Sequence, residues 1–101
     1  MTTSVLAQDL ETVRAIVLGH LKGYRAKVYL FGSQAAGKIR PTSDIDVAVL
    51  PLQPLPELTF FNIREALEES DVVRNVDVVN LTETDETFRQ RVRKEGVLWK
   101  G

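Results

Sequence analysis

The chain has 101 residues, which is enough for one domain with a single hydrophobic core and too few for two. Thirteen Lys and Arg against fourteen Asp and Glu give a net charge of −1, which excludes the strongly basic field of many nucleic-acid-binding domains. The absence of cysteine excludes disulfides and thiolate metal sites. No apolar run has membrane-spanning length and no signal-peptide pattern opens the chain, so we expect a single cytoplasmic domain over residues 1–101 with no membrane contact.

The hydrophobic pattern predicts helices and strands in mixed order. Apolar residues recur at steps of three and four in the helical segments, and short apolar runs mark the strands. We expect helices over residues 4–22, 57–69 and 84–95, and strands over residues 26–31, 44–50 and 75–81. In the last helix, acidic residues fall in the first turn and basic residues in the last, which suits the helix dipole. Gly96 stands where a C-terminal cap belongs, and the tail 97–99 is expected to fold back on the core.

The spacing of a Gly-Ser pair and two aspartates is the most informative motif. Gly32 and Ser33 follow the first strand, and Asp44 comes after ten further residues, at the start of the second strand with Asp46. Successive side chains on a strand point to opposite faces, so Asp44 and Asp46 are expected to share one face. Two carboxylates opposite a Gly-Ser turn suit a divalent metal and a phosphate chain, as in phosphoryl or nucleotidyl transfer.

A structural role for the aspartate pair is the alternative. An acidic pair at the start of a strand is also typical of an exposed sheet edge, and aspartate pairs are common in loops. However, aspartate is disfavoured in strands and costly in a core, yet it twice interrupts an apolar run here. The full spacing is also rare by chance in a chain of this length. We therefore favour the functional interpretation of Asp44 and Asp46.

Asp77 interrupts the third strand in the same way. It stands between Val76 and Val78, so its side chain is expected to emerge on the face opposite to theirs. If this strand neighbours the strand that begins at Asp44, then Asp77 can join Asp44 and Asp46 at one metal cluster. The alternative is an edge-strand charge that discourages aggregation.

The segment between the two motifs offers further contacts for an anion. Residues 34–37 are expected to form one or two helical turns that aim backbone N–H groups at a phosphate. Lys38 and Arg40 could steady a triphosphate or could be solvated loop charges, and the sequence leaves both interpretations open.

Together, the Gly-Ser pair, the two aspartates and the strand of Asp77 resemble the signature of the DNA polymerase β-like nucleotidyltransferase superfamily. The resemblance is to its minimal branch in particular, the MNT proteins. The resemblance is carried by Phe31-Gly32-Ser33, by Ser43-Asp44-Ile45-Asp46-Val47 after nine intervening residues, and by Val76-Asp77-Val78-Val79. It implies an α/β (α+β) fold with a small mixed sheet and helices packed on it. Relatives often carry arginines after the Gly-Ser pair, where this chain has Gln34 and Ala36, and an acidic residue where it has Lys38.

The expected reaction is transfer of AMP from ATP to an acceptor hydroxyl, with Mg²⁺ as cofactor. Gly32 would let the backbone approach the phosphates, and Ser33 would seat the β- or γ-phosphate. Asp44 and Asp46 would bind Mg²⁺, and Asp77 would help to hold the catalytic metal or accept the proton of the hydroxyl. The resemblance further implies a HEPN-domain toxin as partner in a hetero-oligomer, a tyrosine of that toxin as acceptor, and an antitoxin role for this chain.

Two other functions stay open. The chain could be an antitoxin that neutralises its partner by binding alone. It could also be a nucleic-acid-binding module that uses the cations of the last helix, which are Arg89, Arg91, Arg93 and Lys94. These cations spread around the helix instead of lining one stripe, so we expect a solvated face and no direct contact with nucleic acid.

Overall fold

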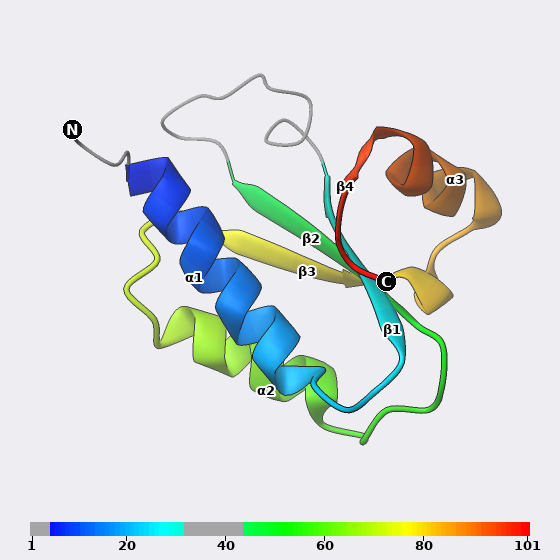
Figure 1. Cartoon of the computed structure of the whole chain (residues 1–101), viewed down its shortest axis with the longest axis horizontal. Coiled ribbons are helices and arrows are strands. Elements are labelled where there is room, and N and C mark those ends of the chain that lie inside the picture. The colour runs from blue at the N-terminus through cyan, green and yellow to red at the C-terminus, as the bar shows by residue number, and fades with distance from the viewer. Residues whose placement is uncertain (1–4, 32–43) are drawn as a thin grey trace.

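The computed structural model describes residues 5–31 and 44–101, apart from the side chains of residues 5 and 6 (Figure 1). In the described residues the elements are α1 (Val5–His20), β1 (Ala26–Phe31), β2 (Ile45–Pro51), α2 (Thr59–Glu68), β3 (Val76–Asn80), the 3-10 turn η1 (Leu81–Glu83), α3 (Glu86–Glu95) and β4 (Val97–Lys100). This arrangement confirms the expected α/β class. None of the described helices is long and apolar enough to cross a membrane.

The described strands form one mixed sheet in the order β3-β2-β1-β4. β1 pairs with β2 and with β4 in antiparallel fashion, whereas β2 and β3 are parallel. The expected return of the tail is confirmed, and it takes the form of a fourth strand along β1. Parallel strands need a long connection, and here α2 provides it between β2 and β3.

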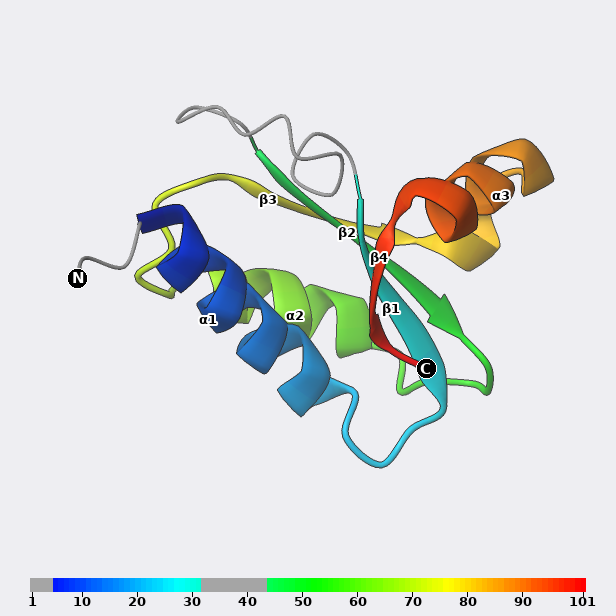
Figure 2. The ribbon, with the colours of Figure 1, turned by 45° about the horizontal axis from the view of Figure 1, so that its top comes forward.

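The main core lies between the sheet and the pair α1 and α2, which cover the same face (Figures 1 and 2). Alternate residues of β1 and β2 enter this core, as a half-covered strand requires. Its fully buried members are Val13, Val17, Leu21, Val28, Ile45, Val47, Val49 and Ile63.

A smaller core lies on the other face of the sheet, where α3 packs. It is built around Tyr29, Ala48, Leu81 and Val92. Phe31 at the end of β1 meets Phe88 of α3 edge to face, with ring centroids 5.6 Å apart. Helix α3 therefore holds the end of β1 on the face where Asp46 and Asp77 emerge.

The end of α3 confirms Gly96 as the C-terminal cap. Its N–H donates to the carbonyl of Val92, and its backbone is extended (φ −79°, ψ 163°). A Cβ at this position would lie 2.6 Å from the Val92 oxygen and 3.1 Å from the Leu30 oxygen. Gly96 is therefore required by close backbone approach to β1.

A buried ion pair ties the connection between α2 and β3 to α1. Arg74 Nη1 donates to Asp9 Oδ2 at 3.1 Å, and the side chains are only 11% and 6% exposed. Within the described part of the chain, the buried Arg74 Nε has no hydrogen-bond partner. Because Arg74 lies two residues before β3, this pair helps to place the strand that carries Asp77.

We predict that Arg74→Met lowers the free energy of unfolding by about 3 kcal/mol, because it leaves the Asp9 carboxylate buried without its partner. Urea denaturation measures the change. Arg91→Met is the matched control, since Arg91 makes an exposed contact of 3.8 Å with Glu95, and it should cost less than about 0.5 kcal/mol. Equal costs for the two variants would contradict this assignment.

Candidate active site

The pairing of β2 with β3 brings two of the expected site residues together. Asp46 is the register partner of Phe31 on β1 and of Asp77 on β3, so the three residues form one row across the sheet. Register partners on adjacent strands direct their side chains to the same face. Asp46 and Asp77 therefore lie side by side on the face of α3, as expected from the sequence. Asp77 does stand on an edge strand, where a charge could discourage aggregation. However, its side chain lies beside a second carboxylate, and two like charges side by side are destabilising, so this alternative is not favoured.

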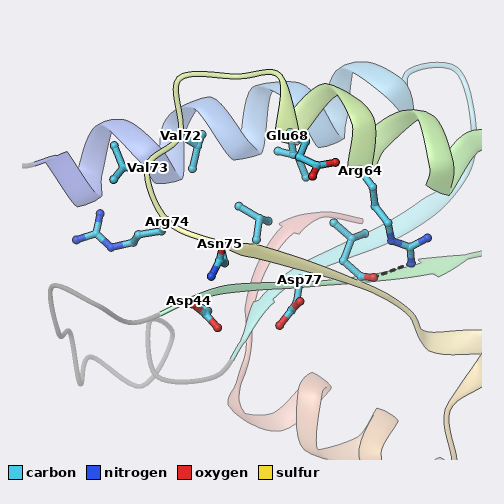
Figure 3. A pocket seen from close by; sticks show the side chains of 11 residues that line it. Asp44, Arg64, Glu68, Val72, Val73, Arg74, Asn75 and Asp77 are labelled. Atoms are coloured by element: carbon cyan, nitrogen blue, oxygen red, sulfur yellow. Dashed lines mark hydrogen bonds between the residues drawn. The ribbon is translucent and has the colours of Figure 1, made fainter.

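Asp44 lies just before β2 and reaches the same region. Together with Asp77 it lines a groove of about 520 Å³ along β3. Figure 3 shows both carboxylates on the same side of β3, opposite to α2. The intervening Ile45 is fully buried in the main core, which confirms the alternation predicted for this segment.

The two neighbouring carboxylates affect the ionisation of Asp46. Burial raises the pKa of Asp46 above its ordinary value, and the negative charges of Asp77 and Asp44 raise this pKa further. A cation bound among them would remove this repulsion. In the residues that the structure describes, however, no three acidic or histidine side chains are placed closely enough to enclose a metal ion.

Four polar residues of the groove were not identified from the sequence. They are Arg64 and Glu68 of α2, and Arg74 and Asn75 of the connection to β3. Arg64 is exposed, and it donates to the carbonyl of Val78 at 2.9 Å and lies over the ring of Phe60. No local pattern marks these residues, because the groove forms only when α2 lies along β3.

The other half of the expected site lies outside the described residues. This holds for Gly32 and Ser33, for the helical turns expected at 34–37, and for Lys38 and Arg40. Their roles therefore stay predictions. The described chain reaches the row of Asp46 and Asp77 at Phe31, the residue directly before Gly32.

The three arginines of α3 take part in local ion pairs. Arg89 and Arg93 both contact Glu86, at 3.1 Å and 2.9 Å, and Arg91 contacts Glu95. Arg89 also donates to the carbonyls of Leu81 and Thr84. These contacts agree with a solvated, internally paired helix face.

Comparison with known proteins identifies the family. Residues 22–100 match the family described as polymerase beta, nucleotidyltransferase. The chain belongs to this nucleotidyltransferase family. It is also 33% identical over 90 residues to a Haemophilus influenzae protein named "Probable protein adenylyltransferase MntA", a match that covers 89% of this chain and 77% of the relative.

Two solved structures have the same fold. One is a toxin–antitoxin complex with AMP-PNP, which is 27% identical with a TM-score of 0.67 and covers 87% of this chain and 73% of the other. The second is a mutant of the MntA-HpeT toxin–antitoxin pair, which is 26% identical with a TM-score of 0.68 and covers 91% and 72%. The nucleotidyltransferase fold expected from the resemblance is thus confirmed.

The raised pKa of Asp46 gives this nucleotidyltransferase a predictable pH dependence of stability. A carboxyl group whose folded-state pKa is raised binds its proton more tightly when folded. Its contribution to stability is fully present below the ordinary value of 3.8 and is lost as the pH rises through the raised pKa. We therefore expect Asp46→Asn to melt at a higher temperature than the wild type near neutral pH.

Thermal melting in the presence of EDTA, followed from about pH 3 to about pH 7, measures this difference. The difference in melting temperature should shrink as the pH falls through the raised pKa. A lower melting temperature for Asp46→Asn at neutral pH would contradict the electrostatic argument.

Proposed function

We propose that the chain is a Mg²⁺-dependent protein adenylyltransferase and acts as the antitoxin of a HEPN toxin. It would transfer AMP from ATP to a hydroxyl of that toxin, a tyrosine by resemblance to the MNT proteins. The observation that carries the proposal is the register of Asp46 with Asp77, which places two carboxylates side by side with Asp44 next to them. The relative named as an adenylyltransferase and the toxin–antitoxin complex with AMP-PNP support the choice of reaction, nucleotide and partner.

The carboxylates suit the proposed metal by their chemistry. Mg²⁺ prefers oxygen ligands and usually combines one or two protein carboxylates with phosphate oxygens and water. Asp44, Asp46 and Asp77 would hold it, and it would neutralise the charge that develops on the α-phosphate. Burial and the negative charges of Asp77 and Asp44 raise the pKa of Asp46, and a bound cation would offset the repulsion, which supports this role.

The chain's own residues would then position the reactants. The acceptor oxygen forms a bond to the α-phosphorus of ATP, the bond from this phosphorus to the oxygen bridging to the β-phosphorus breaks, and pyrophosphate leaves. Asp77 would accept the proton of the hydroxyl. Gly32 and Ser33 directly follow Phe31, which lies in the same row as Asp46 and Asp77. They would bind the departing phosphates through backbone N–H groups and the Ser33 hydroxyl.

We predict that Asp46→Asn and Asp77→Asn each lower the rate of AMP transfer by about 100-fold or more, because such reactions depend on electrostatic stabilisation at the transferred phosphate. Transfer of label from radioactive ATP to the co-purified HEPN toxin measures the rate. Asp71→Asn makes the same chemical change on the exposed turn after α2 and serves as the matched control.

The same assay separates catalysis from neutralisation by binding alone. If the chain acts only by binding, the wild type labels nothing, and Asp46→Asn still neutralises the toxin. Labelling that persists at the wild-type rate in the Asp44→Ala plus Asp46→Ala variant would refute the proposed mechanism.

A further inference from the structure

The outer edge of β3 carries backbone groups that no strand pairs with in the described chain. β3 is the last strand of the sheet on this side. The N–H of Ile45 donates to the carbonyl of Asn75, and Ile45 is the register partner of Val76. In a parallel ladder this register directs the N–H and C=O groups of Val76 and Val78 away from β2.

One of these groups is already occupied by a side chain. The guanidinium of Arg64 donates to the carbonyl of Val78 at 2.9 Å. The N–H and C=O of Val76 and the N–H of Val78 have no such contact in the described residues. Within residues 5–31 and 44–101, both the N–H and the C=O of Val76 are therefore available to pair with a new strand.

The groove of about 520 Å³ runs along this same edge. Figure 3 shows β3 between α2 on one side and the carboxylates of Asp44 and Asp77 on the other. On the wall towards α2, Leu67 and Val78 are buried in the main core and Val76 is partly exposed, while Arg64 and Glu68 add exposed charges of opposite sign. The groove is thus continuous with the candidate active site.

We propose that the edge of β3 docks an extended segment of the partner protein as an additional strand and so presents the acceptor hydroxyl to Asp77. This inference rests on the proposed transfer reaction and adds how its protein substrate is recognised. An added strand would lie about 4.8 Å from β3, with its backbone bonded to Val76 and to the N–H of Val78.

The alternation of side chains along such a strand gives the substrate a pattern. The residue alongside Asp77 points to the carboxylate face, where the hydroxyl must arrive. Its two neighbours point to the other face, where Val76 is partly exposed beside the charges of Arg64 and Glu68. We therefore expect a hydroxyl residue with at least one apolar neighbour in the docked segment.

An extended polypeptide of a partner protein suits this surface better than a nucleic acid or a second copy of this chain. A nucleic acid would meet the carboxylates of Asp44 and Asp77 with its phosphates and would have no use for a row of backbone donors and acceptors. A second copy would bring its own edge, where Arg64 again occupies a carbonyl. An acceptor protein that docks on β3 would have its hydroxyl placed next to the carboxylate of Asp77, where the proposed transfer takes place.

The decisive variant is Val76→Pro. Proline is tolerated at the first residue of an edge strand, and here it removes an N–H that β2 does not use. Val76→Thr keeps both the N–H and the branched shape and is the matched control. The measurements are kcat/KM for AMP transfer to the co-expressed HEPN toxin and the affinity for ATP with Mg²⁺.

We expect Val76→Pro to lower kcat/KM for the toxin about tenfold, while Val76→Thr stays within about twofold of the wild type. Both variants should bind ATP as the wild type does. Equal kcat/KM in the two variants would overturn the docking model. A wild type that labels no toxin would instead refute the proposed reaction.

Amide exchange in the wild-type complex, followed by NMR, tests the docking independently of any variant. Exchange at Val76 and Val78 should slow when the toxin is added. Unchanged exchange would overturn the proposal even if Val76→Pro proves unstable. Slowing with increasing concentration of the chain alone would assign the edge to a second copy and also overturn it.

Discussion

The parallel pairing of β2 with β3 is the constraint on which the candidate site depends. Each strand begins with an apolar residue that is followed by an aspartate, and the register aligns Ile45 with Val76 and Asp46 with Asp77. Because the strands run in the same direction, the two aspartates meet at the same end of the sheet. A shift of one residue would send one of the carboxylates into the main core.

The rest of the fold keeps this register in place. Helix α2 crosses from the end of β2 back to the start of β3, and its residues Ile63 and Leu67 are buried against the sheet. The ion pair of Arg74 with Asp9 fixes the last part of the crossover to α1. On the other face, the contact of Phe31 with Phe88 holds the end of β1 beside the same row. Helices on both faces thus support one row of residues.

The site opposes folding, because burial and the negative charges of Asp77 and Asp44 all disfavour the ionised form of Asp46 and raise its pKa. Like charges on adjacent strands are destabilising, so their presence is better explained by chemistry than by folding. The edge position of β3 likewise has a cost for the protein and a possible use in function. An open edge is a risk for aggregation, and Arg64 covers part of it, but the open part lies next to the carboxylates where a protein substrate would have to arrive.

The sequence alone predicted most of the helices and strands and singled out the three carboxylates. Periodicity placed the helices and strands to within a few residues, and the interruption of apolar runs by Asp44, Asp46 and Asp77 singled out the carboxylates, because an unexplained charge in a strand is costly. Only the tertiary structure decided that β3 pairs in parallel with β2, that the tail becomes β4, and that Arg64 and Arg74 join the groove. These features depend on contacts between segments far apart in the chain, which local patterns do not encode. The Gly32-Ser33 pair and the aspartates thus indicated a type of reaction. The packing of α2 along β3, which local patterns do not encode, forms the groove where we propose that the protein substrate docks.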